Sequence, residues 1–508
     1  MNAGRNPDGG RRLAPARKFP LTLWVAAAIS IAGLPGRAES VARGPLRVHP
    51  GNPRYFTDGS GKAIYLTAAH TWDNLPDIGL SDPPPAFDFD RYLKFLADHN
   101  YNYIRLWRWE TPKDIEKDGI VRYSAPHPWK RTGPGTAWDG KPKFDLSAFN
   151  EEYFSRMRKR VEMAGARGIY VSVMLFNGWE LQFSNWSGHP FNAANNSNGI
   201  DGDPDKDGRG TEIESWPLPA GVEKLEKAYV RKVIDTVNDL DNVLYEITNE
   251  DNGSPEDTAW QYHMIDFIKG YESHKPKQHP AGMTHQWPDG KNAAEFNNPG
   301  EWFSPGEEGG FQTDPPTADG SKVVLNDTDH SFFFTGLQKA GLEGQRAWVW
   351  KNFTRGNQTL FMDPYIDPTP WYITTRNGPQ GRKPDPYWET LRINMGYTHV
   401  YADRINLASM TPQCALASTG YCLAGTSPRG AEFLVYLPQG PWLTVDLSNV
   451  SGMLAVEWFN PSTGVVTAGE PIAGGKKASL MAPFSGDAVL YLVQTPAGSK
   501  TLTGPTSP

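Results

Sequence analysis

The chain is poor in the residues that cross-link proteins or bind transition metals. Its 508 residues include only two cysteines, Cys414 and Cys422, and eleven histidines. Two neighbouring cysteines are too few for a structural zinc site. No His-x-His or His-Glu-x-x-His spacing occurs, which argues against a metallohydrolase, and we predict no cofactor for catalysis. In an oxidising compartment we expect a local disulfide between the two cysteines, with two free thiols as the alternative.

Long apolar runs are also scarce. The run at residues 21–34 is too short to span a bilayer. It follows a basic segment and precedes the small-x-small sequence Gly36-Arg37-Ala38, the pattern of a cleaved secretory signal over residues 1–38. An uncleaved membrane anchor is the alternative. We therefore expect a secreted protein, extracellular or periplasmic, with no membrane span after cleavage.

An excess of positive charge is lacking too. The formal net charge is −7, and loss of residues 1–38, with six basic and one acidic side chain, would change it to −12. Nucleic-acid binders need clustered Lys and Arg to contact phosphates, and no basic stripe with interleaved aromatics is present. We therefore expect no nucleic-acid partner. Aromatic residues, at 12%, are plentiful and suit a large core or a sugar-binding cleft.

What the sequence does contain is an alternation of strand and helix patterns. Eight strand candidates end near residues 72, 109, 179, 250, 287, 302, 329 and 363, of which the sixth is the weakest. Such alternation predicts an α/β fold, a (β/α)8 TIM barrel. A β-hairpin is expected within residues 46–65. The long segments 111–143 and 178–219, rich in Gly, Pro, Asn and Asp, would shape a binding face.

The pattern changes from residue 409 onward. Short alternating runs are separated by turn residues, which predicts a small antiparallel β-sandwich. A chain of this length also favours two domains. The predicted organisation is a signal peptide (1–38), a barrel with its N-terminal hairpin (39–408), a β-sandwich (409–496) and a loose tail (497–508).

Two strand candidates end in carboxylic acids. The fourth ends in Asn249-Glu250 and the seventh breaks into Asp327, Asp329 and His330. Barrel enzymes place catalytic groups at such strand ends, and glycoside cleavage needs two carboxyl groups. We assign Glu250 as the acid/base and Asn249 as a ligand of a sugar hydroxyl. Asp327 is favoured as the nucleophile because it directly follows the buried run. A period of two places Asp329 on the same side, so it remains the alternative. His330 would orient or tune the pair, unless it lies at the surface.

These motifs resemble the large clan of retaining (β/α)8 glycoside hydrolases, in which an Asn-Glu pair follows the fourth strand and the nucleophile follows the seventh. Residues 100–105 resemble the clan's second strand, which implies that Arg105 supports the nucleophile and keeps a carboxylate ionised. Residues 54–58 and 65–72 resemble the opening of the apiosidase-like hydrolases. Residues 456–464 resemble a module that carries the name of a collagen-binding domain. The clan usually has Glu as nucleophile, so the shorter Asp leaves inversion open beside the retention that we expect.

Further residues at predicted strand ends are candidates for sugar binding. Tryptophans could stack on sugar rings, with core packing as the alternative; they are Trp72, Trp107, Trp179 and Trp287. Side chains at similar heights could bind hydroxyl groups, and these are His70, Asn177, Glu180 and Asp363.

One segment has the spacing of a calcium loop. Asp203, Asp205 and Asp207, followed by Gly208 and then Glu214, match Asp-x-Asp-x-Asp-Gly-x5-Glu. Two prolines, Pro217 and Pro219, interrupt the exiting helix that an EF-hand requires. We therefore predict a lone structural Ca²⁺ loop, with an Asp/Gly-rich surface turn as the alternative.

Taken with these motifs, the chain is predicted to be a secreted glycoside hydrolase that cleaves a poly- or oligosaccharide by a two-carboxylate, retaining mechanism. The alternative function is a non-catalytic carbohydrate- or matrix-binding protein on a barrel scaffold. No motif specifies the sugar, the linkage, exo or endo action, or the oligomeric state.

Overall fold

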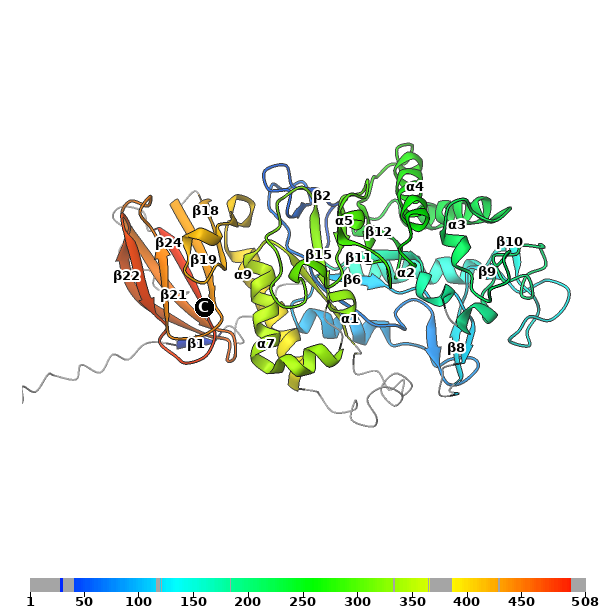
Figure 1. Ribbon diagram of the computed structural model, residues 1–508, viewed down its shortest axis with the longest axis horizontal. Helices are drawn as coiled ribbons and strands as arrows, with labels where there is room; N and C mark the ends of the chain where they lie inside the picture. The colour runs from blue at the N-terminus through cyan, green and yellow to red at the C-terminus, as the bar shows by residue number, and fades with distance from the viewer. Residues whose placement is uncertain are drawn as a thin grey trace, which may run out of the picture.

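Two units make up the part of the chain that the computed structural model describes. The described residues are 28–30, 41–115, 119, 121–182, 184–331, 334–363, 365, 386–427 and 430–494. A closed barrel of eight parallel strands is followed by antiparallel sheets (Figure 1). This confirms the predicted α/β barrel with an antiparallel β domain after it. Among the described helices, none has the length and apolar character needed to cross a membrane.

The barrel strands lie side by side in chain order, and the last, β16, pairs with the first, β4. All eight predicted strands are present, the weak sixth included. They are β4 (Thr67–His70), β6 (Tyr103–Leu106), β11 (Tyr170–Phe176), β12 (Val243–Thr248), β13 (Ala281–Thr284), β14 (Trp302–Ser304), β15 (Val323–Asp327) and β16 (Gln358–Met362). Because they are parallel, their C-terminal ends open onto one face.

Helices cover the outside of the barrel. Several begin at the polar residues that favour helix starts: Asp88 and Asn150 cap two of them, and Ser254 forms a capping box with Asp257. Their apolar faces pack on the strands in one large core. These helices are α1 (Phe89–Asp98), α2 (Glu151–Gly165), α3 (Val222–Val237), α4 (Pro255–Glu272), α5 (Asn292–Phe296), α7 (Phe334–Thr354) and α9 (Pro386–Arg404). The short helix α6 (Thr328–Ser331) directly follows β15.

The long segments between strands and helices carry structure of their own. The first contains β7 (Lys113–Ile115) and β8 (Val121–Ala125), which join β5 (Asp77–Gly79) in an antiparallel sheet, and β9 (Trp129–Lys130), which pairs with β10 (Asp145–Phe149). The second contains the 3-10 turns η2 (Gly178–Leu181), η3 (Ser184–Gly188) and η4 (Thr211–Glu214). Strands β8 to β10 lie at the end of the molecule opposite the C-terminal sheets (Figure 1).

The C-terminal unit has two antiparallel sheets with an apolar core between them. One is the pair β20 (Trp442–Asp446) and β23 (Lys477–Met481). The larger contains β17 (Thr411–Pro412), β18 (Cys422–Ser427), β19 (Gly430–Leu437), β21 (Met453–Asn460), β22 (Val465–Ala473) and β24 (Ala488–Gln494). Its edge strand is β1 (Ala28–Ser30), within the predicted signal peptide. The other residues of that peptide up to Ala38, and the predicted tail at 497–508, lie outside the described residues.

Two remaining features were expected from the sequence. The N-terminal hairpin is present as β2 (Arg47–Val48) and β3 (Phe56–Thr57). The two cysteines, in contrast, are free. Cys422 is buried in the core between the C-terminal sheets, whereas Cys414 lies in a turn with its Sγ 4.0 Å from Thr317 Oγ1. The structure therefore has the two free thiols of the alternative, and burial raises the pKa of the Cys422 thiol to about 12.

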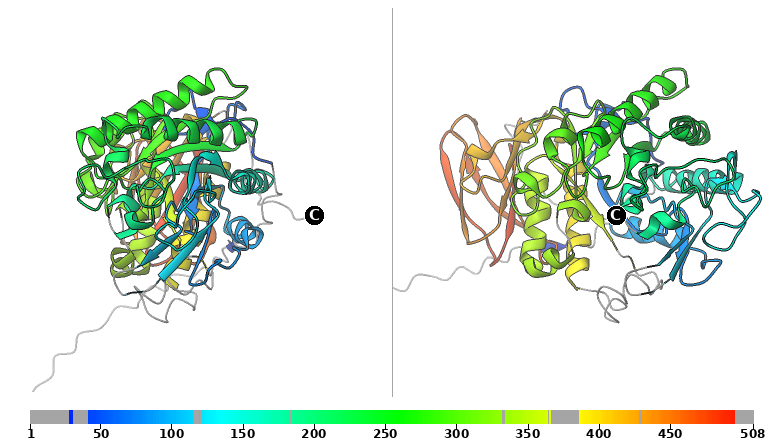
Figure 2. Two further views of the ribbon diagram at one scale, coloured as in Figure 1. Left: turned by 90° about the vertical axis from the view of Figure 1, so that its right-hand side faces the viewer. Right: turned by 45° about the vertical axis from the view of Figure 1, so that its right-hand side comes forward.

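Helices α7 and α9 lie between the barrel and the C-terminal sheets (Figure 2). Trp350 of α7 stacks on Tyr436 of β19, with ring centroids 6.4 Å apart, and both belong to one apolar cluster with Phe459 of β21. Arg346 of α7 pairs with the buried Asp487 at 2.8 Å. The two units therefore share a continuous core.

Candidate active site

A buried arginine connects the ends of three barrel strands. Arg105 of β6 is 1% exposed. It donates to both carboxylate oxygens of Glu246 in β12, to Asp327 Oδ2 in β15 at 3.0 Å and to Asn249 Oδ1 at 2.9 Å. Arg105 thus lies beside the acids of the seventh strand, where the resemblance places it. Glu246 was missed in the sequence, although a lone acid inside an apolar strand run is a signal that could have revealed it.

The two aspartates of the seventh strand differ in their surroundings. Asp327 is fully buried, and its two oxygens accept from Arg105 and from the backbone N–H of Asp329 at 3.0 Å. Asp329 lies in α6 with its side chain 9% exposed, and its Oδ2 is 3.8 Å from Arg105 Nη1. Burial raises the pKa of each carboxyl to about 6, and the charge of Asp327 adds to the rise at Asp329. Arg105 opposes the rise in both.

Glu250 lies just beyond β12 in an unusual backbone conformation. Its φ is 51°, in the left-handed region that residues other than glycine seldom adopt. One carboxylate oxygen of Glu250, one of Asp329 and a ring nitrogen of His330 all lie within 4.8 Å of one another. Strained backbone of this kind is common where a side chain must be aimed into a site. The structure therefore brings Glu250 together with Asp329.

The imidazole of His330 faces the same acids. Its Nε2 lies 3.2 Å from Asn249 Oδ1 and 3.6 Å from Asp329 Oδ2. Burial lowers the pKa of His330 well below its usual value, and the nearby Arg105 adds to this effect, so the ring is neutral. The alternative of a surface histidine is wrong, because His330 is 8% exposed.

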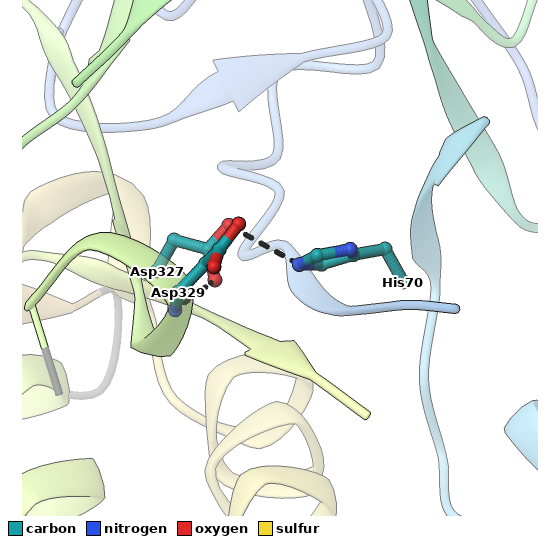
Figure 3. A group of neighbouring side chains, drawn as sticks. All are labelled: His70, Asp327 and Asp329. Carbon is teal, nitrogen blue, oxygen red and sulfur yellow. Dashed lines mark hydrogen bonds and ion pairs between the residues drawn. The ribbon is translucent and has the colours of Figure 1, made fainter. Parts of the chain in front are cut away.

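A second histidine, His70, points toward the two aspartates (Figure 3). His70 ends β4, fully buried, with Nε2 3.5 Å from Asp327 Oδ2, and it forms a close group with both aspartates. Its ring stacks on Trp107 with centroids 5.1 Å apart, and Trp72 contacts both rings edge-on. Burial lowers the pKa of His70 well below its usual value, so it is neutral too.

The four predicted tryptophan platforms differ in exposure. Trp72 and Trp107 are 8% and 4% exposed, and Trp179 is partly buried against the barrel core. Trp287, after β13, is 42% exposed. Its backbone oxygen and that of Glu250 accept from the same amide, Gln182 Nε2, at 2.8 and 2.7 Å. Of the four, only Trp287 presents a large surface.

Three of the predicted hydroxyl ligands make contacts within the protein. Glu180 accepts from the backbone N–H of Glu110 at 2.7 Å and from Asn177 Nδ2 at 3.0 Å. Burial raises the pKa of Glu180 to about 8. Asp363 pairs with Arg392, whose Nε is 2.7 Å away. Asn177, Glu180 and Asp363 are all fully buried, and these contacts hold the strand ends in place.

The calcium-like loop brings together a different set of acids from the predicted one. One carboxylate oxygen each of Asp203, Asp205 and Glu212 lie within 4.8 Å of one another. Glu214 instead turns toward β12 and accepts from Thr248 Oγ1 at 2.8 Å, buried. Glu214, predicted as a ligand, thus lies outside this group of acids, because successive residues of the 3-10 turn η4 are rotated by about 120° and Glu212 and Glu214 point in different directions. Asp207 accepts from the N–H of Arg209.

Comparisons with known proteins agree with this architecture. A family model described as a domain of unknown function, DUF6298, matches residues 123–286, less than half of the chain. No curated protein matches significantly. A solved structure named as a glycoside hydrolase has 14% identity and a TM-score of 0.57, covering 89% of this chain and 97% of that one. A glycoside hydrolase family 5 protein from Bacteroides vulgatus has 16% identity and a TM-score of 0.58, covering 90% and 95%.

These likenesses are at low identity and show the fold. The chain has a closed (β/α)8 barrel followed by antiparallel sheets, a fold similar to that of these two solved structures. The resemblances to apiosidase-like hydrolases and to the module named for collagen binding stay predictions from the sequence.

Proposed function

We propose that the protein is a secreted, retaining glycoside hydrolase with Glu250 as acid/base and Asp329 as nucleophile. The observation that carries the proposal is the approach of these two carboxylates to within 4.8 Å at the C-terminal face of the barrel. Retaining enzymes hold their carboxyl groups about 5–5.5 Å apart, whereas inverting enzymes leave roughly 6.5–9.5 Å for a water molecule. The sequence of residues 1–38 supports export.

Asp329 is a better nucleophile than Asp327. A nucleophile needs an oxygen directed at the sugar, but both oxygens of Asp327 are engaged with protein donors, and its side chain is inaccessible. Asp329 is partly exposed and lies with Glu250. The order of preference differs from that favoured from the sequence because β15 ends at Asp327 and α6 begins at the next residue. Asp327 then positions Arg105 and the backbone of Asp329.

The reaction follows from this geometry. Glu250 gives its proton to the glycosidic oxygen as the bond to the anomeric carbon breaks, and the bond's electron pair goes to that oxygen. An oxygen of Asp329 bonds to the anomeric carbon at the same time. In the second step Glu250 takes a proton from water, the water oxygen bonds to the carbon, and Asp329 leaves as a carboxylate. Arg105 favours the ionised form of the aspartates.

The test is sugar release from a panel of polysaccharides and aryl glycosides, in which the native protein and Glu250→Gln are compared. The panel includes side-chain sugars of plant polysaccharides because of the sequence resemblance to apiosidase-like hydrolases. We expect the variant to lose about 10²–10⁴-fold in rate, the usual contribution of a general acid. Equal release by both proteins would contradict the assignment. Binding without release by either would favour the non-catalytic alternative.

We also propose a structural Ca²⁺ at Asp203, Asp205 and Glu212. Carboxylate oxygens are the ligands that Ca²⁺ prefers. Both carboxylate oxygens of Glu212 are buried without a hydrogen-bond partner among the described residues. The pKa of Glu212 is raised by burial and by the neighbouring aspartates, which a bound cation would relieve.

A further inference from the structure

Two walls of the barrel mouth differ in their chemistry. On the wall formed by the ends of β4 and β6, Nδ1 of His70 and Nε1 of Trp107 are buried with no hydrogen-bond partner in the described part of the chain, whereas Nε2 of His70 faces Asp327 Oδ2 at 3.5 Å. Buried polar atoms nearly always have partners, because leaving them unpaired is costly. A ligand with hydroxyl groups would satisfy these atoms, since a neutral imidazole offers one donor and one acceptor and an indole offers one donor.

The other wall follows β12 and β13. Here the loops run side by side, with Asp289 N donating to Asn252 O at 3.2 Å. The amide of Gln182 joins them further by donating to the backbone oxygens of both Glu250 and Trp287. Trp287, 42% exposed, is therefore carried by the same pair of loops as the acid/base.

We propose that the sugar being transferred lies against His70 and Trp107, which bind its hydroxyls, and that the first sugar of the leaving group stacks on Trp287. The inference rests on the proposed function. His70 forms a close group with Asp329, the residue that bonds to the transferred sugar. Trp287 is joined to Glu250, the residue that gives a proton to the leaving oxygen. The two walls thus divide the substrate at the bond that is cleaved.

The test uses two substrates that contain the same transferred sugar but differ in the leaving group. The first is the shortest oligosaccharide that the native enzyme hydrolyses, and the second is the glycosyl fluoride of the same sugar, which has no leaving-group ring. Trp287→Ala should lower kcat/KM at least about tenfold more for the oligosaccharide than for the fluoride, because a stacked ring is lost only in the first. Trp287→Phe, which keeps an aromatic face, should recover much of the difference.

Trp107→Phe tests the other wall, because it keeps an aromatic ring and removes the N–H. We expect kcat/KM to fall by the same factor, about tenfold, for both substrates, because one hydrogen bond to the transferred sugar is lost in each. The matched control is Trp442→Ala, an exposed tryptophan on β20 in the C-terminal sheets, which should change neither substrate. Melting curves for every variant separate loss of binding from loss of folding.

Several results would overturn the inference. If Trp287→Ala lowers kcat/KM equally for both substrates, Trp287 contacts the transferred sugar and not the leaving group. If Trp107→Phe is folded and has native kinetics, the Trp107 N–H does not bind the transferred sugar. In those cases release of sugar would still depend on Glu250, so the proposed function would stand. Release that is absent, or equal in native protein and Glu250→Gln, would overturn both.

Discussion

The C-terminal end of the barrel interior and the core between the C-terminal sheets bury opposite kinds of side chain. Inside the barrel, Arg105 is surrounded by Glu246 and Asp327, all three at most 1% exposed. Between the C-terminal sheets the core is apolar, with Leu490 and Leu492 among its fully buried members. Buried ion networks contribute little net stability compared with apolar packing of the same volume. We therefore interpret the buried charges of the barrel as part of a functional site, and the apolar core of the C-terminal sheets as structural packing.

The largest expected effect separates the two aspartates within the charged interior. Asp329→Asn should abolish turnover, because an amide oxygen cannot replace the carboxylate as nucleophile. Added azide should restore cleavage of an activated aryl glycoside and give a glycosyl azide of inverted configuration. The measurement is product analysis by NMR. Asp327→Asn should be slow as well, but without rescue by azide; rescue of that variant instead would make Asp327 the nucleophile.

The next prediction compares the two cores directly. Arg105→Met leaves Glu246 and Asp327 without their cation and should lower the free energy of unfolding by about 3–5 kcal/mol. Leu490→Ala should lower it by about 2–5 kcal/mol through a cavity. Urea unfolding gives both values. Of the two variants, only Arg105→Met should lose activity under conditions where the variant remains folded. A folded and active Arg105→Met would show that the buried charges of the barrel are not needed for catalysis.

The pH dependence sharpens the same comparison. Since the pKa values of Asp327 and Asp329 are raised to about 6, kcat/KM should increase as pH rises through about 6 and the nucleophile ionises. The folded-state pKa of both groups lies above the ordinary value of 3.8, so the folded protein binds their protons more tightly than the unfolded chain does. The free energy of unfolding should therefore decrease as pH rises from about 4 to about 6. A pH–rate profile and unfolding curves measure the two effects. A pH–rate profile whose acid limb lies near pH 4 would show that the pKa of the nucleophile is not raised.

The smallest effect concerns calcium. If Asp203, Asp205 and Glu212 bind Ca²⁺, saturating Ca²⁺ should raise the melting temperature by about 2 °C or more relative to chelator, as expected for a ligand that binds only the folded state. Glu212→Gln should remove the shift. Asp446→Asn, in β20, is a control that should retain it. An unchanged melting temperature in the native protein would contradict the site.

Much of the fold was readable because strand periodicity and strand ends are local properties. The eight barrel strands were all located correctly, with Asp327 at the end of β15 and Glu250 just beyond β12. Strand β22 was missed because it lacks a regular alternation of apolar and polar residues and contains Gly469 and Pro471. The sequence could not choose between Asp327 and Asp329, nor show that Glu212 lies nearer than Glu214 to Asp203 and Asp205, because the chain enters a helical turn within one or two residues of each acid. Periodicity over a longer window cannot detect such a change.

The junction between the two units has a consequence for how such a chain can evolve. Domains that are joined by flexible linkers share few contacts, so one can be exchanged without disturbing the core of the other. Here Trp350 of α7 and Tyr436 of β19 complete a single apolar cluster. A recombination event between the units would expose both halves of that cluster to water. The C-terminal sheets are therefore expected to be inherited together with their barrel, and to change in step with the outer surfaces of α7 and α9.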